Sequence, residues 1–160
     1  MMTKRRFLAG LGTTLLAGGA GLTKAVAESI EKLRLTRAQW RERLTPDQFE
    51  VLRQEGTEPP WSSPLNDEER NGTYHCAGCD LPLFESDTKY DSGTGWPSFY
   101  DHIPGHIGTK TDLKLIIPRK EYHCIRCDGH QGHVFKDGPR PTGLRYCMNS
   151  VSLDLEKKDR

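Results

Sequence analysis

The sequence predicts a mainly β domain, an antiparallel and barrel-like sheet stapled by four cysteines, with short helices before it. Three observations lead to this fold class. Helix-starting signals cluster before residue 56, short strand patterns separated by Gly, Pro and Asp follow residue 74, and two Cys-x-x-Cys pairs lie among those strands. Helices first and strands later are typical of a helical arm packed on an antiparallel sheet.

Residues 28–55 are predicted to be helical. Thr36 and Thr45 are each followed three residues later by Gln, which is the spacing of a capping box. Pro46 fits the first position of the second helix, and Gly56 fits its end. We therefore expect two short helices in this stretch.

The domain organisation follows from these signals. The Pro-rich stretch 58–64 is expected to wrap irregularly over the surface, so that residues 28–64 form a helical arm with its wrap. Residues 65–160 form the β domain that carries the cysteines. About 133 residues in 28–160 are enough for one folded unit with its own core. The predicted strands are Leu113–Ile117, Tyr122–Cys124, His133–Phe135, Arg145–Cys147 and Val151–Leu155.

Residues 1–27 have the features of an export signal peptide. A positively charged start is followed by a mildly apolar, glycine-containing run from Phe7 to Ala20, and Ala25-Val26-Ala27 is a small-x-small cleavage site. The run is too short and too rich in glycine for a membrane span, which needs about 20 strongly apolar residues. We expect cleavage after Ala27 and no stable membrane association afterwards, the alternative being an uncleaved anchor.

The charged start resembles the twin-arginine signal S/T-R-R-x-F-L. Thr3-Lys4-Arg5-Arg6-Phe7-Leu8 fits with Lys4-Arg5 as the basic pair, which departs from the pattern by one Lys. Alternatively Arg5-Arg6 is the pair, and the spacing to Phe7 is one residue short. A protein exported in its folded state would reach the oxidising compartment with its thiolates already bound to metal. Unfolded thiols would tend to form disulfides there. The expected location is therefore the bacterial periplasm.

The charge of the chain argues against nucleic acid as its partner. Residues 1–27 hold four of the 23 basic residues and none of the 22 acidic ones. The remainder carries 19 basic against 22 acidic residues, a formal charge of −3. Nucleic-acid affinity usually depends on a basic surface, which this composition does not supply.

Four of the five cysteines form two pairs with two-residue spacing, Cys76/Cys79 and Cys124/Cys127. Two such turns can close a tetrahedral site around one structural Zn²⁺. The 44 residues between the pairs mean that the site would pin two distant turns together. A redox-active pair and two structural disulfides are the alternatives.

The fifth cysteine, Cys147, is the candidate nucleophile. Arg145 is two positions away and leaves a strand on the same face, where its charge favours the thiolate. His130 and His133 follow the second cysteine pair directly, and histidine is the natural proton donor near neutral pH. An inert buried cysteine, a solvated histidine turn and a second metal site with Cys147 remain open at this point.

Three further stretches make a family resemblance specific. KYDSGTGWPSF at 89–99, GHQGHVF at 129–135 and PTGLRYCMNSVSL at 141–153 resemble the methionine-R-sulfoxide reductases of the B type. The two cysteine pairs stand where the zinc-containing members of that family have theirs. The resemblance covers roughly residues 35–155, and its motifs occur in the family's order.

The resemblance implies reduction of the R epimer of methionine sulfoxide, in oxidised proteins or free, to methionine. It implies that Cys147 attacks sulfur and becomes a sulfenic acid, while histidines protonate the oxygen. The residues that the resemblance assigns are Cys147, His130, His133, Asn149 and Arg145 for catalysis, Trp96 and Phe135 for substrate binding, and Cys76, Cys79, Cys124 and Cys127 for zinc.

One departure from the family is consequential. Many members carry a resolving cysteine between the glycines of the GWPSF loop, whereas this chain has Thr94. With four sulfurs on zinc, Cys147 has no partner within the chain, so an external reductant, thioredoxin-like or another thiol, is expected to regenerate it.

We expect a monomer. The competing functions are a zinc-stapled binding module with an incidental Cys147, and a thiol–disulfide oxidoreductase that uses one cysteine pair.

Overall fold

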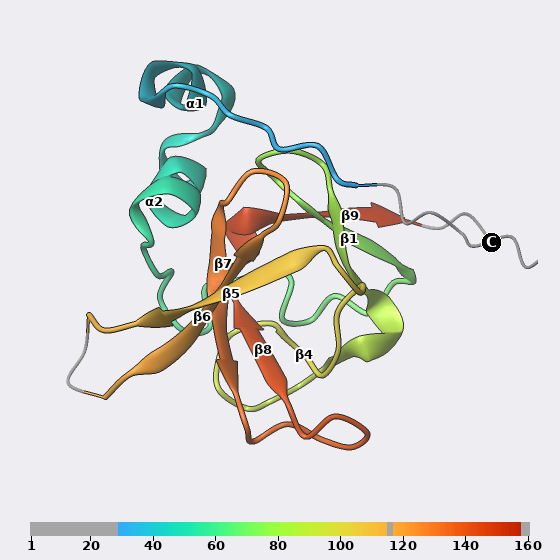
Figure 1. Ribbon diagram of the computed structural model, residues 1–160. Coiled ribbons are helices and arrows are strands. Elements are labelled where there is room, and N and C mark those ends of the chain that lie inside the picture. The colour runs from blue at the N-terminus through green and yellow to red at the C-terminus, as the bar shows by residue number, and fades with distance from the viewer. Residues whose placement is uncertain (1–28, 115–116, 158–160) are drawn as a thin grey trace, which may run out of the picture.

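The computed structural model describes residues 29–114 and 117–157 (Figure 1). The predicted export signal at 1–27 lies outside the described residues. Within the described part of the chain, no helix has the length and hydropathy needed to cross a bilayer.

The helical arm consists of α1 (Arg37–Arg43) and α2 (Pro46–Gln54), which lie together at one end of the molecule (Figure 1). Both predicted capping boxes are confirmed, since Thr36 and Thr45 each accept a hydrogen bond from the third helical N–H. The helical prediction was wrong for the described residues before Thr36. They form neither helix nor strand, and the Leu33 N–H donates to the carbonyl of Arg126, far along the chain, at 2.8 Å.

The strands confirm a mainly antiparallel β fold. A three-stranded sheet has the order β2-β1-β9, and a six-stranded sheet has the order β3-β4-β8-β7-β6-β5. The strands are β1 (Gly72–Cys76), β2 (Pro82–Glu85), β3 (Lys89–Tyr90), β4 (Ser98–Phe99), β5 (Ile107–Asp112), β6 (Arg119–Cys124), β7 (His130–Phe135), β8 (Arg145–Met148) and β9 (Leu153–Lys157), with short 3₁₀ helices at η1 (Ser86–Thr88) and η2 (Ser150–Ser152).

One predicted strand, Leu113–Ile117, was wrong. The strand is β5, and it ends at Asp112, whose carboxylate accepts the Lys114 N–H at 2.9 Å and turns the chain. Leu113 and Ile117 lie in the β5–β6 connection and are 72% and 76% exposed. Of the predicted strand, the described residues 113, 114 and 117 belong to no strand, whereas the more polar 107–112 pairs along its whole length with β6.

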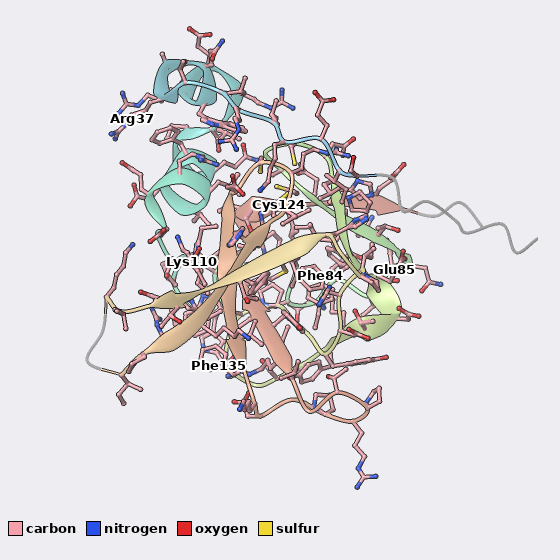
Figure 2. The ribbon with its side chains drawn as sticks, in the orientation of Figure 1. Arg37, Phe84, Glu85, Lys110, Cys124 and Phe135 are labelled. Carbon is pink, nitrogen blue, oxygen red and sulfur yellow. The ribbon has the colours of Figure 1, made fainter. Side chains whose placement is uncertain are left out.

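An aromatic core joins the two sheets. Phe84 of β2 stacks on Phe99 of β4 with ring centroids 4.5 Å apart, and Tyr74 of β1 meets Phe99 edge-on at 4.9 Å. Tyr146 of β8 and Tyr122 of β6 close the cluster at 5.4 Å from each other, and Figure 2 shows Phe84 inside the body of the molecule. Because neighbouring residues on a strand point to opposite faces, burying Tyr146 in this core turns Cys147 to the other face of the sheet.

Candidate functional site

The cysteine pairs form two matching turns. Cys76 ends β1 and Cys124 ends β6, and each pair is followed by a left-handed aspartate, Asp80 with φ 61° and Asp128 with φ 56°. The amide of each first cysteine is also held alike. Cys76 N–H donates to the Leu81 carbonyl at 2.8 Å, and Cys124 N–H donates to the Gly129 carbonyl at 3.0 Å. Each turn therefore holds its own two sulfurs on one side.

The four sulfurs of these turns meet in one buried cluster, and Figure 2 shows Cys124 in the half of the molecule nearer the helices. All four lie within 4.8 Å of one another, with Cys76–Cys127 at 3.7 Å and Cys79–Cys124 at 3.5 Å. A tetrahedral metal with metal–sulfur bonds of about 2.3 Å would separate its ligands by about 3.8 Å. The five cysteines are free thiols, so the alternative of two structural disulfides does not describe this structure. The cluster fits a metal ion.

Cys147 lies in a row of polar side chains that crosses the sheet. Antiparallel pairing sets Cys147 opposite Ser98 on β4 and opposite His133 on β7, and His133 is opposite Glu121 on β6. Glu121 in turn is opposite Lys110 on β5. Directly opposed residues have Cβ atoms about 4.5–5.5 Å apart on the same face. The register thus places the side chains of Cys147 and His133 next to each other on one face of the sheet.

Two opposing effects act on the Cys147 thiol. Burial raises its pKa, and the positive charge of Arg145 on the same strand lowers it. Arg145 itself is held by a bidentate ion pair with Asp137, at 2.9 and 2.8 Å, and its guanidinium lies 4.3 Å from the Phe135 ring centroid. Arg145, which the sequence analysis predicted as a site residue, is therefore held in place near Cys147, and the Asp137 carboxylate partly neutralises its charge.

His133 is oriented by an acidic residue that the sequence analysis missed. Its Nε2 lies 2.8 Å from Oδ2 of Asp112, which also accepts from Arg119 at 2.7 Å. Among the described residues Nδ1 of His133 has no hydrogen-bond partner, so it is the nitrogen left for a ligand. Burial lowers the pKa of His133, and the bond to Asp112 opposes that change.

His130 is more deeply buried, at 2% exposure, and its ring centroid lies 5.4 Å from that of His133. Its Nδ1 is 3.2 Å from Oε1 of the buried Glu121, close enough for an ionic contact but not aligned as a hydrogen bond. Burial lowers the pKa of His130, and Glu121 opposes the change. The structure thus brings two imidazoles together, each faced by a carboxylate.

Trp96 and Asn149 are joined through a residue of the Pro-rich wrap, Glu58. The Trp96 indole N–H donates to the Glu58 carbonyl at 3.0 Å, and the Glu58 N–H donates to Asn149 Oδ1 at 2.9 Å. The Glu58 carboxylate accepts the amide and hydroxyl of Ser150 at 2.7 and 2.6 Å. The wrap therefore fixes both predicted residues in place.

The predicted residues assemble into two groups. Cys147, Arg145, His133 and Phe135 share one face of β7 and β8, with His130 beside them, while Trp96 and Asn149 share Glu58. Asp112, Glu121 and Glu58 were missed by the sequence analysis. The available signal was the alternation of charged residues at Lys110 and Asp112, followed by Glu121 on the next strand. The strand was instead predicted at the apolar run Leu113–Ile117, so these charged residues were not assigned to a strand.

A family model described as the SelR domain matches residues 44–157. The chain therefore belongs to the SelR-domain family, a family of oxidoreductases.

Its relatives carry a more specific name. The chain is 52% identical over 131 residues to a "Peptide methionine sulfoxide reductase MsrB" of Pseudomonas putida, covering 81% of this chain and 98% of that protein. It is 54% identical over 124 residues to the chloroplastic "Peptide methionine sulfoxide reductase B1" of Oryza sativa, covering 77% of this chain and 58% of that protein. A relative from Leifsonia xyli is 54% identical over 123 residues, covering 76% of this chain and 88% of that protein.

Proposed function

We propose that this chain reduces the R epimer of methionine sulfoxide, in oxidised proteins or free, to methionine. The single observation that carries the proposal is the pairing of Cys147 directly opposite His133, whose ring Asp112 orients and whose Nδ1 is left open. The family membership and the names of the relatives support the same reaction. The choice of epimer rests on the resemblance of the sequence motifs.

The chemistry needs a sulfur nucleophile and a proton at one place. Cys147 sulfur attacks the sulfoxide sulfur while an imidazole delivers a proton to the oxygen, because an unprotonated sulfoxide oxygen is a poor leaving group. The attack forms a sulfur–sulfur bond between Cys147 and the substrate, and the imidazole hands on to the oxygen the proton that it took from the Cys147 thiol. The protonated oxygen then leaves the substrate sulfur and bonds to the Cys147 sulfur, while the sulfur–sulfur bond breaks with its electron pair on the substrate, so that methionine leaves with two more electrons. The thiol proton ends on the new sulfenic acid, so the step balances.

Each remaining residue has a role that its contacts support. The half-buried indole of Trp96 and the Phe135 ring offer apolar surface for the methyl group of the substrate. Arg145 limits the rise in the pKa of the Cys147 thiol, so that more thiolate is present at neutral pH. Asn149 fixes the wrap that holds Trp96.

Regeneration is proposed to use an external thiol, thioredoxin-like or otherwise. One thiol condenses with the sulfenic acid of Cys147 to give a mixed disulfide and water, and a second thiol then releases Cys147 as a disulfide of the donor. The position between Gly93 and Gly95 holds Thr94, and the other four sulfurs lie in the cluster. After one substrate equivalent, mass spectrometry should therefore find no disulfide within the chain. A bond from Cys147 to any of the other four would contradict this route.

The cluster is proposed to hold one structural Zn²⁺ through Cys76, Cys79, Cys124 and Cys127. Zinc favours four thiolates in a tetrahedron and, having no redox chemistry, would stabilise the fold without taking part in the reaction. Metal analysis of the purified protein should find about one zinc per chain. Loss of that metal in the Cys124→Ser variant and its retention in Cys147→Ser would assign the ligands.

The decisive experiment is turnover of separated R and S sulfoxide epimers with a dithiol reductant, comparing the wild type with Cys147→Ser. The proposal expects activity on the R epimer alone and its loss in the variant, with the melting temperature unchanged. Equal activity on both epimers would refute the proposed reaction. A variant that keeps full activity would point to a redox-active cysteine pair, and a wild type without turnover would favour a binding module.

Residues 1–27 are proposed to export the chain to the periplasm by the twin-arginine route. Cell fractionation should find the wild type in the periplasm, and Arg5→Lys together with Arg6→Lys should retain it in the cytoplasm. The exported form should carry its full metal content, since a folded chain crosses with its thiolates occupied. A disulfide between the two cysteine pairs in that form would contradict folded export.

A further inference from the structure

Gln131 is a fully buried polar residue between the two histidines on β7, and the proposed reaction gives it no role. Its side-chain Nε2 donates to the sulfur of Cys76 at 3.3 Å, while its Oε1 has no partner among the described residues. Burying an amide without full hydrogen bonding costs free energy, about 1–3 kcal/mol per unpaired group. An apolar side chain would fill this position without that cost, so the contact to sulfur needs an explanation.

The backbone of the same residue is linked to Trp96, one of the two residues proposed to bind the substrate, and the surroundings of Trp96 are here called the substrate pocket. The Gln131 carbonyl accepts two hydrogen bonds from Asn149, from its N–H at 3.1 Å and from Nδ2 at 3.3 Å. Asn149 Oδ1 accepts the Glu58 N–H, and the Glu58 carbonyl accepts the Trp96 indole N–H. Hydrogen bonds thus link the sulfur cluster to Gln131, Gln131 to Asn149, Asn149 to Glu58 and Glu58 to the indole, with the covalent structure of each residue joining one bond to the next.

We propose that Gln131 is a positioning residue that couples the four-cysteine metal site to the substrate pocket. Its amide group stabilises the sulfur of Cys76 at one end, and its carbonyl fixes Asn149 at the other. The inference rests on the proposed metal for the state of the sulfur, and on the proposed function for the role of Trp96.

The charge of the cluster explains why a hydrogen-bond donor lies next to the sulfur of Cys76. Four thiolates outweigh the charge of one divalent cation, so a buried cluster of this kind is stabilised by N–H groups directed at its sulfurs. Within the described residues, and apart from the four cysteines themselves, Gln131 is the one side chain that donates a hydrogen bond to a sulfur of the cluster. Partners of metal ligands typically change metal affinity about 10- to 100-fold when they are removed.

The first test replaces the donor at nearly constant volume with Gln131→Met. The purified variant should release its metal to a chelator about 10- to 100-fold faster than the wild type. In the cobalt-substituted protein, the sulfur-to-cobalt charge-transfer bands should shift, because Cys76 sulfur has lost its hydrogen bond. The control is Val134→Ala, which shortens a partly buried side chain packed against the core on the same strand, removes no hydrogen bond to the cluster, and should leave both readouts unchanged. Release and spectrum equal to the wild type would overturn the proposal.

The second readout addresses the pocket end. In the metal-loaded Gln131→Met protein, the Trp96 indole N–H resonance, assigned with Trp96→Phe, should shift relative to the wild type, although the indole N–H itself bonds to Glu58. An unchanged Trp96 resonance together with faster metal release would overturn the coupling.

Should Gln131→Met fail to fold, the wild type itself provides the test. After substitution with an NMR-active cadmium isotope, a hydrogen bond to a bound thiolate gives a scalar coupling between the Gln131 side-chain amide protons and the metal. Presence of that coupling supports the proposal, and its absence overturns it. None of these readouts requires turnover, so they can succeed even if the reductase activity is not found.

Discussion

Metal removal should lower the stability of this protein by an amount that can be calculated from its chain connectivity. The cluster joins two turns separated by the 44 residues between Cys79 and Cys124. In the chain-entropy model, a cross-link closing a loop of that length stabilises the fold by about 4 kcal/mol. For a domain of this size each kcal/mol corresponds to roughly 3–5 °C, so the melting temperature should fall by about 15 °C.

The assay is thermal unfolding followed by circular dichroism, before and after treatment with a strong chelator, with the metal content measured in both samples. Cys147→Ser is the matched control, because its sulfur is outside the cluster and both its metal content and its melting temperature should equal those of the wild type. Cys127→Ser should behave like the chelated protein, since three sulfurs leave the site open. If a sample shown to be metal-free melted within about 3 °C of the loaded protein, the chain-entropy reasoning would be refuted.

Three further outcomes follow from the ion pairs and titrating groups. Arg145→Met should raise the pKa of Cys147, because the positive charge that opposes burial is lost, and alkylation of the thiol at neutral pH should slow. In the wild type the bond to Asp112 raises the pKa of His133, so Asp112→Asn should lower that pKa further. The NMR titration of His133 and the basic limb of the pH–rate profile should both move to lower pH. Glu55 has its pKa lowered from 4.5 to about 2, chiefly by its bond to a lysine, so it stabilises the fold above pH 4.5 and less as the pH falls toward 2. Glu55→Gln should accordingly melt below the wild type at pH 7, and the difference should shrink on acidification; a difference independent of pH would contradict the sign.

The local elements were predictable from the sequence because their causes are local. Both helix starts follow from a Thr and a Gln three residues apart, and the structure has both capping boxes. The pairing of the cysteines into two turns follows from their two-residue spacing, since such a turn directs both sulfurs to one side. The strand prediction at Leu113–Ile117 failed for a related reason, because a short apolar run does not by itself identify a strand.

What the tertiary structure alone decided is which side chains meet. Cys147 faces His133, and His133 faces Glu121, because the register of three strands is set by an aromatic core on the opposite face of the sheet. The partners that orient the histidines, and the hydrogen bonds that lead from Cys76 through Gln131, join residues far apart in the sequence. Sequence patterns report the period and the ends of each element. The register between elements depends on long-range packing, and a shift of one residue would turn Cys147 into the core.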